Sequence, residues 1–377
     1  MKIQYIIYLF LSIIFLTCSN LDEGKSINKD SIQIENKEAK LFSIEENKDL
    51  IILTIFDKKG NLKDEYYLIP HTHKIPDSLK QKNIIRTPVK NFVCLSTTHI
   101  AFIDMLEESK AIKAVSGSQY VYNENVRTEI ETGIIKDVGY ENSLDFELLL
   151  SLKPDIVTVY DINGTISPVI NKLKKFNIPV VQINEYLEPS LLGQTEWLKF
   201  FAEFFNKRDL ANTKFEDIYN SYNELKKIAD TIKEKPTVLL NMPWKGTWYI
   251  PGGKSNIAQL IEDAGGNYLW KENQETHNNP LSIEEVYLKA NQADVWLNTG
   301  QANNLSDIID SDKRLAKFKA IKTKSVYNRN KRLNKFGGND YMESGIIRPD
   351  FILKDLIKIL HPHLFPEDDF FYYTKLE

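Results

Sequence analysis

The stretch ELLLSLKPDIVTVYD, Glu147–Asp161, decides the fold. It places apolar residues at helical spacing before a KPD break and then an apolar run that is typical of a buried β-strand. The stretch EEVYLKANQADVWLNTG, Glu284–Gly300, repeats the pattern, and its first glutamate lies seven positions before Asn291, just as Glu147 lies seven before Pro154. Each copy predicts a helix that leads into a strand, once in each half of the chain.

The same alternation continues on both sides of these two stretches. NFVCLS, AIKAVSGS and IPVVQIN read as strands in the first half, and TVLLN, ADVWLN and SVYNRN read as strands in the second. Helical patterns separate them, which predicts parallel βαβ units. Residues 206–234 keep a helical pattern without Gly or Pro. We therefore predict an α/β fold: two Rossmann-like α/β lobes joined by a single long helix, with a ligand cleft between the lobes.

The pattern also predicts where each part begins and ends. The expected parts are a signal peptide over 1–18, a flexible tether over 19–40, an N-terminal β-hairpin extension over 41–82, an N-terminal α/β lobe over 83–205, the linking helix over 206–234, a C-terminal α/β lobe over 235–365 and a peripheral tail over 366–377. The hairpin is predicted from two apolar runs that flank the turn sequence KKGN.

The N-terminus indicates export. Its apolar run, Tyr5–Leu16, is too short to span a membrane but fits the apolar region of a signal peptide. The sequence FLTCSN that follows resembles a bacterial lipobox, in which Cys18 would become the lipidated first residue. The alternative is an ordinary secretory signal that is cleaved elsewhere. Lipidation predicts anchoring in the cell envelope, at a periplasmic or outer-membrane surface.

Composition narrows the class of protein. A chain of 377 residues is long enough for two domains. Its net charge is −4 and its pI is about 6.0, so it lacks the basic excess that is typical of nucleic-acid-binding proteins. If Cys18 is lipidated, only Cys94 remains, which leaves no internal disulfide. We expect a monomer whose lobes are held by apolar cores.

The order of these features resembles the class III substrate-binding proteins of ABC importers, which include vitamin B12-, haem- and ferric-siderophore-binding proteins. The matching stretches are VGYENSLDFELLLSLKPDIV, IEDAGGNYLW, LSIEEVYLKANQADVWL and RPDFILKDLIKILHP. The resemblance implies a carrier rather than an enzyme, without a cofactor of its own, that delivers its ligand to an ABC permease in the inner membrane. It also implies that Glu147 and Glu284 dock onto the permease, with Glu285 as an adjacent competitor. The extension and Asn291, where proline is usual, depart from the family pattern.

Polar and aromatic residues that follow predicted strands are the candidate ligand contacts, because ligands of open α/β sheets bind near the carboxyl ends of the strands. Thr98 could instead cap a helix, and Trp248 could instead pack in the core. The candidates in the first lobe are Thr97, Thr98, His99, Gln119, Tyr120, Tyr140 and Tyr160, and those in the second are Trp244, Trp248, Asn298 and Tyr341.

The expected ligand is a metal chelate: a ferric siderophore first, cobalamin or another corrinoid second, and haem third. We expect no direct metal site, because the pairs His71/His73 and His361/His363 have no third ligand at suitable spacing. One alternative is a chelatase or siderophore-processing enzyme on the same scaffold, with His99 and Asp161 as acid and base. Another is a surface scavenging lipoprotein serving an outer-membrane receptor, suggested by the acidic pair Asp22–Glu23.

Overall fold

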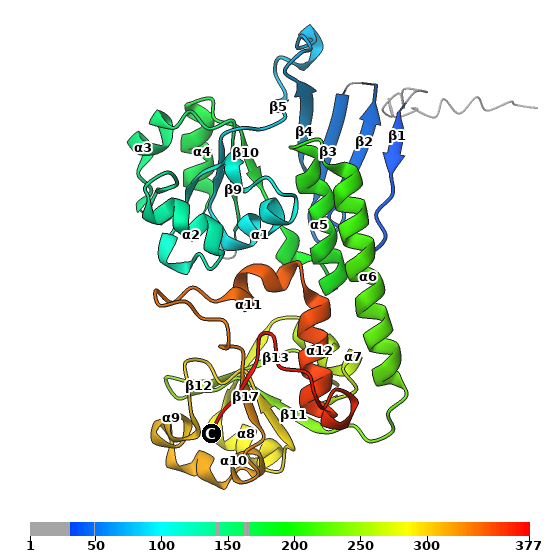
Figure 1. Ribbon diagram of the computed structural model, residues 1–377, viewed down its shortest axis with the longest axis vertical. Helices are drawn as coiled ribbons and strands as arrows, with labels where there is room; N and C mark the ends of the chain where they lie inside the picture. The colour runs from blue at the N-terminus through cyan, green and yellow to red at the C-terminus, as the bar shows by residue number, and fades with distance from the viewer. Residues whose placement is uncertain (1–30, 49, 141–142, 162–163, 165) are drawn as a thin grey trace, which may run out of the picture.

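Two lobes lie one above the other along the long axis of the molecule, and helix α6 (Arg208–Asp230) runs beside both (Figure 1). The computed structural model describes residues 31–377 except 49, 141–142, 162–163 and 165. The signal peptide, Cys18 and the pair Asp22–Glu23 therefore lie outside the described residues. No helix in the described part of the chain is long and apolar enough to cross a membrane.

The N-terminal lobe is built on a parallel sheet with the order β10-β9-β6-β7-β8. Renumbered along the lobe, this is the Rossmann order 3-2-1-4-5, which places a topological switch point between β6 and β9. Its elements are β6 (Phe92–Cys94), α1 (Thr97–Met105), β7 (Ile112–Val115), α2 (Glu124–Glu131), β8 (Lys136–Asp137), α3 (Phe146–Ser151), β9 (Ile156–Val159), α4 (Ser167–Lys175) and β10 (Val180–Gln182).

The C-terminal lobe has a sheet with the order β14-β11-β16-β17-β18, in which only the last pair is antiparallel. Its first four strands follow the flavodoxin-like order, with a switch point between β11 and β16. A small antiparallel sheet, β12-β13-β15, lies beside it. The elements are β11 (Thr237–Leu240), β12 (Pro243–Trp244), β13 (Thr247–Pro251), α7 (Asn256–Asp263), β14 (Asn267–Tyr268), β15 (Asn278–Ser282), α8 (Ile283–Ala290), β16 (Val295–Leu297), α9 (Leu305–Ser311), α10 (Lys319–Lys322), β17 (Val326–Asn328), α11 (Asp340–Glu343), α12 (Pro349–Leu360) and β18 (Thr374–Lys375).

These lobes and the long helix confirm the predicted fold class. Helix α5 (Leu191–Glu203) ends before Asn206, whose left-handed φ of 57° separates α5 from α6. The 23 residues of α6 span roughly 35 Å at 1.5 Å per residue.

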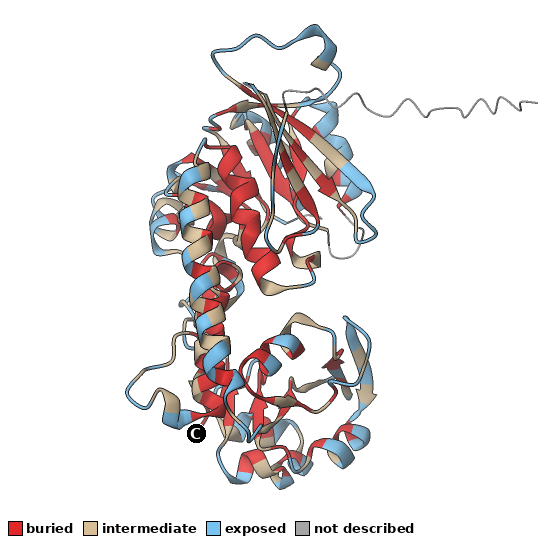
Figure 2. Ribbon diagram, turned by 90° about the vertical axis from the view of Figure 1, so that its right-hand side faces the viewer, coloured by how far each residue is buried: buried red, intermediate tan, exposed pale blue. Residues whose placement is uncertain are grey.

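The N-terminal extension is larger than the predicted hairpin. It forms a five-stranded sheet of β1 (Ile32–Ile34), β2 (Phe42–Asn47), β3 (Leu50–Phe56), β4 (Leu62–Pro70) and β5 (Asn83–Thr87). The sheet thus includes residues expected in the tether and at the start of the N-terminal lobe. Its inner face packs on α5, of which every residue except Leu191 is buried (Figure 2). A helix that is buried on all sides needs cover on all sides, and the extension supplies part of that cover.

Two buried carboxylates attach the start of this extension to the N-terminal lobe. Glu196 on α5 accepts the backbone N–H groups of Lys37, Glu38 and Ala39 at 2.7–3.1 Å. Glu188 accepts those of the next two residues at 2.9 Å. Buried carboxylates are stable only with such partners, so the segment is fixed rather than a free tether from residue 37 onward.

The tail is also part of the core, which corrects the expectation that it is peripheral. Tyr372, Tyr373 and Leu376 are fully buried, and β18 pairs with β17. The carboxylate of Asp355 accepts the backbone N–H groups of residues 371–373 at 2.6–3.1 Å. The tail was missed because its apolar run Phe370–Tyr373 is short and follows an acidic stretch, although Tyr372 and Tyr373 are buried in the C-terminal lobe.

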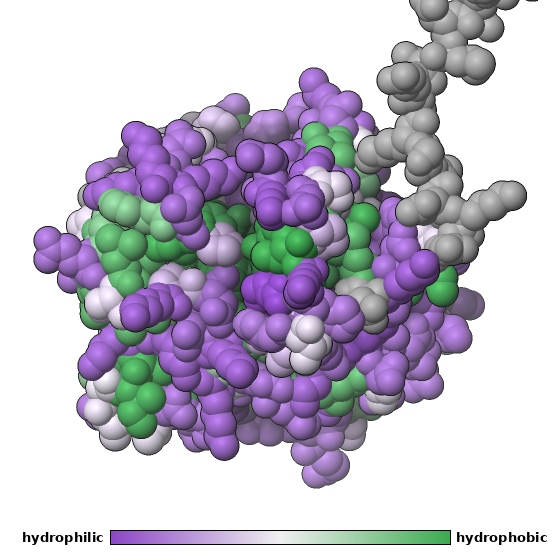
Figure 3. Space-filling model, turned by 90° about the horizontal axis from the view of Figure 1, so that it is seen from above, coloured by the Kyte–Doolittle hydropathy of each residue, from purple (hydrophilic) through white to green (hydrophobic). Residues whose placement is uncertain are grey.

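The outer end of the N-terminal lobe, with the extension, is mostly hydrophilic and carries separate groups of apolar residues (Figure 3). At the opposite end of this lobe, residues 331–348 of the C-terminal part cross over from the other lobe and contact it, with α11 between the lobes (Figure 1). The range 235–365 that was predicted for the C-terminal lobe therefore does not enclose a self-contained lobe, because part of it contacts the N-terminal lobe.

Candidate functional site

A cavity of about 640 Å³ lies at the switch point of the C-terminal lobe, where the chain leaves β11 and β16. This position is where open α/β sheets bind ligands. The cavity is lined by Asn241, Met242, Pro243, Trp244, Tyr249, Asn298, Thr299, Gly300, Gln301, Ala302, Asp307 and Arg329.

Asn241 and Asn298 shape the floor of this cavity. Each follows the last residue of its strand and adopts a left-handed backbone, with φ of 63° and 60°. Asparagine tolerates this conformation better than most residues, so both strands can turn sharply there. The Oδ1 atom of Asn298 accepts from the Tyr373 hydroxyl at 3.1 Å, while the buried Thr299 hydroxyl lacks a partner among the described residues. Asn298 is therefore fixed by the tail, and Thr299 offers an unused hydrogen-bonding group.

Two aromatic side chains form one wall. Trp244 is 61% exposed and Tyr249 is 39% exposed, and both belong to the small antiparallel sheet. Exposed rings of this size suit a large ligand with a flat or apolar face. Trp248 alternates with them and points the other way: it is fully buried and packs on Trp296 and Phe318. The expectation that Trp248 contacts a ligand is corrected, because its ring fills the core of the lobe.

Arg329 brings a positive charge to the cavity. It directly follows β17, and no carboxylate of the described residues lies within ion-pair distance of it. Its guanidinium lies over the ring of Tyr341, 4.8 Å from the ring centroid. Tyr341 therefore supports Arg329 and does not line the cavity itself. Arg329 and Tyr249 were missed as site residues, although Arg329 follows a predicted strand and the same rule could have found it.

In the N-terminal lobe, three hydroxyl-bearing residues follow β6 near its switch point. Ser96 and not Thr98 occupies the N-cap position of α1, since the helix begins at Thr97. The hydroxyl of Thr98 donates to Glu185 at 2.8 Å and bonds to that of Ser96 at 2.9 Å. Thr97 and Thr98 are partly buried, so their predicted ligand contacts stay a prediction.

The expectation that His99 contacts a ligand is corrected by the structure. Its side chain is fully buried, 5.8 Å from the ring of Phe201, and burial lowers its pKa to about 3. Neither ring nitrogen has a partner among the described residues. A side chain in this position fills the core between α1 and α5 and does not reach a ligand in the cleft.

A second group of predicted contacts gathers beyond β7 and β8. Tyr120 and Tyr140 are 54% and 44% exposed, with ring centroids 6.3 Å apart. The Gln119 amide donates to the Tyr140 hydroxyl. Gly117 permits this approach, since a Cβ there would lie 2.8 Å from the Tyr140 ring. The structure therefore brings together Gln119, Tyr120 and Tyr140.

Tyr160 and Asp161 follow β9 at the switch point. Both are half-buried, and the Tyr186 hydroxyl donates to the backbone carbonyl of Asp161. No group of three or more His, Cys, Asp or Glu side chains in the described part of the chain could hold a metal ion.

A second cavity, of about 470 Å³, is shared by the two lobes. Its lining comes from Tyr186 and Pro189 of the N-terminal lobe, Lys254 and Asn256 of the C-terminal lobe, and Lys40 of the extension. The side chains of Lys58 and His277 also reach it. The space between the lobes is therefore open and polar on this side.

The two glutamates of the repeated pattern occupy equivalent places. Glu147 and Glu284 are each the second residue of their helices, α3 and α8, and both are exposed. Glu284 is ion-paired with Arg314, whereas the neighbouring Glu285 is used in a capping box with Ser282. The docking roles of Glu147 and Glu284, with Glu285 as an adjacent competitor, stay a prediction. Hydrogen bonds from its own backbone N–H and from the Arg314 guanidinium lower the pKa of Glu284.

Comparison with known proteins shows which family this chain belongs to. Residues 93–333 match the family model described as periplasmic binding protein. An uncharacterized lipoprotein of Methanocaldococcus jannaschii is 26% identical and aligns over 92% of this chain and 88% of its own length.

Solved structures share the fold. The molybdate-binding protein MolA of Haemophilus influenzae has a TM-score of 0.58 and 22% identity, over 78% of this chain and 93% of that one. A periplasmic haem-binding protein of Pseudomonas aeruginosa has a TM-score of 0.54 and 15% identity, over 73% and 93%. The chain belongs to the periplasmic binding protein family, as a non-catalytic substrate-binding protein of the class III type that serves ABC transporters.

Proposed function

We propose that this protein captures a metal chelate between its lobes and delivers it to an ABC permease. A ferric siderophore is the first candidate, cobalamin or another corrinoid the second and haem the third. The observation that carries the proposal is the cavity of about 640 Å³ in which the exposed rings of Trp244 and Tyr249 stand beside Arg329. Flat rings suit a large ligand, and a guanidinium that no carboxylate of the described residues pairs suits a negatively charged group on it.

The opposite lobe supports the same ligand class. Gln119, Tyr120 and Tyr140 present an amide and two exposed rings at the carboxyl ends of neighbouring strands. In the C-terminal lobe, Asn298 and Thr299 add polar groups to the lining of the cavity. Metal would then be held by the chelator and not by protein side chains.

Docking is proposed to use Glu147 and Glu284, one in each lobe. Two exposed acids at the same helical position can pair with basic groups of a permease and fix the orientation of the carrier. Lipidation at Cys18 would keep the protein in the cell envelope, close to that partner. A surface lipoprotein that serves an outer-membrane receptor is the alternative, and it would not need these two acids.

The ligand can be tested by co-elution, because the three chelate classes absorb visible light. The chain from residue 19 onward, which keeps every described residue, is mixed with ferrichrome, ferric enterobactin, cobalamin or haemin and separated by gel filtration. Retention of one chelate at a stoichiometry near one supports the proposal. If the protein elutes free of every chelate, the proposal is wrong.

A further inference from the structure

The lobes are connected a second time by residues 331–348, which we call the strap. The strap leaves β17 of the C-terminal lobe, passes between the lobes as α11 and returns as α12 (Figure 1). Two contacts fix it to the C-terminal lobe: the hydroxyls of Ser344 and Tyr372 lie 2.8 Å apart, and Asn339 donates to the Arg329 carbonyl at 3.0 Å. An ion pair between Arg332 and Asp340 holds the strap together internally.

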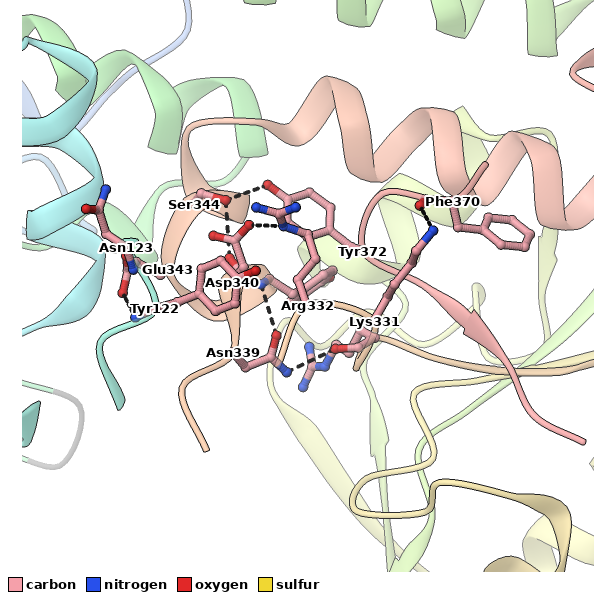
Figure 4. A network of polar contacts seen from close by, with 12 residues as sticks. Tyr122, Asn123, Lys331, Arg332, Asn339, Asp340, Glu343, Ser344, Phe370 and Tyr372 are labelled. Atoms are coloured by element: carbon pink, nitrogen blue, oxygen red, sulfur yellow. Dashed lines mark hydrogen bonds and ion pairs between the residues drawn. The ribbon is translucent and has the colours of Figure 1, made fainter. Parts of the chain in front are cut away.

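The strap is bound just as closely to the N-terminal lobe. The carboxylate of Glu343 accepts the backbone N–H groups of Tyr122 and Asn123 at 2.7 and 2.8 Å (Figure 4). Asn334 donates to the Val121 carbonyl at 2.8 Å. A Cβ on Gly338 would come within 2.9 Å of the carbonyl oxygens of residues 120 and 121. The strap thus contacts four consecutive residues of one loop.

Glu343 is the central contact of this set. Its side chain is nearly fully buried, and burial raises its pKa to about 8, assisted by the nearby charges of Asp340 and Asp104. The two N–H donors act in the opposite direction and favour the carboxylate. An acid in such a place is costly unless its hydrogen bonds are made, so loss of the contact with this loop leaves a buried group without partners.

The loop held in this way carries two of the proposed ligand contacts. Gln119 and Tyr120 immediately precede Val121, and they form the short helix that ends there. The carbonyl of Arg329, a residue of the cavity, accepts from Asn339, four residues before Glu343 in the same strap. A single short segment therefore connects the ligand-facing groups of the two lobes.

We propose that Glu343 is a positioning residue which, by holding Tyr122 and Asn123, fixes the distance between Gln119–Tyr120 and the cavity of the other lobe. The strap then determines the size of ligand that the cleft accepts. This selection of ligand size rests on the proposed function, whereas the holding of the loop does not.

Backbone hydrogen exchange of the ligand-free chain tests the holding role. In Glu343→Gln, one carboxylate oxygen becomes an amide group that cannot accept, so the amides of Tyr122 and Asn123 are expected to exchange about tenfold faster than in the wild type. Asn334→Ala cuts a second contact to the same loop and is expected to act in the same direction. Unchanged exchange at these two amides in both variants would overturn the proposal.

Glu196→Gln is the matched control, since Glu196 is also a buried carboxylate that accepts backbone N–H groups but lies at the extension. It is expected to accelerate exchange at residues 37–39 and to leave residues 122–123 unchanged. Faster exchange at residues 122–123 in this control would mean that any weakened carboxylate loosens the loop, and would overturn the specific role of Glu343.

Binding of ferrichrome, ferric enterobactin and cobalamin tests the selection of size. For any two of these chelates that the wild type binds, the ratio of the two dissociation constants is expected to change by about tenfold in Glu343→Gln. The change in that ratio is expected to be smaller in Glu196→Gln. If the wild type binds a chelate and the ratio is the same in the variant, size selection is wrong and the proposed function stands. If the wild type binds none of them, the proposed function and size selection fall together, and exchange alone decides whether Glu343 holds the loop.

Discussion

Trp248 stacks on Trp296, with ring centroids 5.5 Å apart and an interplanar angle of 29°. Both rings are fully buried, and Phe318 lies against each of them. Trp244, four residues before Trp248, is largely exposed at the cavity. The small sheet therefore sends one tryptophan into the core and offers the other to a ligand.

The two tryptophans are expected to respond differently to truncation. Trp248→Ala opens a cavity in the core and is expected to cost about 3–5 kcal/mol of the free energy of unfolding. Trp244→Ala removes an exposed ring and is expected to change that free energy by less than about 0.5 kcal/mol, while weakening chelate binding. Denaturant unfolding and a binding titration check both. Equal losses of stability in the two variants would contradict the assignment.

Arg329 is expected to set the preference for negatively charged chelates. Arg329→Gln keeps a hydrogen-bond donor but removes the charge. Because a charge-assisted hydrogen bond contributes about 1.5–3 kcal/mol, the affinity for ferric enterobactin is expected to fall at least about tenfold. The matched control is Arg86→Gln on β5 of the extension, away from the cavity. Isothermal titration at two salt concentrations measures the effect. Equal affinities in the wild type and both variants would show that Arg329 does not contact the ligand.

Charge reversal of Glu147 and Glu284 together is expected to weaken binding to the permease at least about tenfold and to leave ligand affinity unchanged. Both side chains are exposed, so the fold is expected to survive. Flotation of permease-containing vesicles with bound carrier measures docking. Reversal of Glu216 and Glu224, which are acids on α6 rather than on the repeated pattern, is the control. If docking is unchanged by the first pair, the docking assignment is wrong.

The raised pKa of Glu343 predicts a particular pH dependence. Its pKa is about 8 in the folded chain and near 4.5 ordinarily, so between these values the folded state binds the extra proton. The contribution of this group to stability therefore falls as pH rises from about 4.5 to 8. The groups that face it are Asp340, Asp104, Tyr122 and the buried thiol of Cys94.

Glu343→Gln is expected to remove that pH dependence, while the other groups titrate alike in both proteins. The variant is expected to be more destabilised relative to the wild type at pH 5 than at pH 8, by more than about 1 kcal/mol. Urea unfolding of both proteins at the two pH values provides the comparison. A difference that does not change with pH would contradict the raised pKa.

The sequence was sufficient for the two α/β lobes because their strands are short, buried apolar runs between amphipathic helices. DIVTVYD and ADVWLN became β9 and β16, and the long uninterrupted helical pattern became α6. Such periodicity is local, so it can be read without knowledge of the tertiary fold.

Long-range packing explains what the sequence missed. The sheet of the extension covers α5, in which Glu196, Lys199 and Glu203 are buried together with the apolar residues. Because these charged residues are typical of an exposed helix face, the sequence did not reveal that α5 is covered on all sides. Trp248 and His99 point into the core because of strand register and helix phase, which residue type alone does not fix. Arg329 could have been found from its place after β17, whereas the contact between Glu343 and Tyr122 joins residues 221 positions apart and has no local signature.

The most direct test of the central claim is quenching of tryptophan fluorescence in the wild type and in Trp244→Phe. Of the five tryptophans, Trp197, Trp248, Trp270 and Trp296 are buried, so Trp244 is the one positioned to report on the cavity. The titration panel is ferrichrome, ferric enterobactin, cobalamin, cobinamide, haemin and molybdate, with free Zn²⁺ as the control. Our account predicts saturable quenching by one chelate class in the wild type and its loss in Trp244→Phe. No response to any chelate, or a response to Zn²⁺ alone, would contradict it.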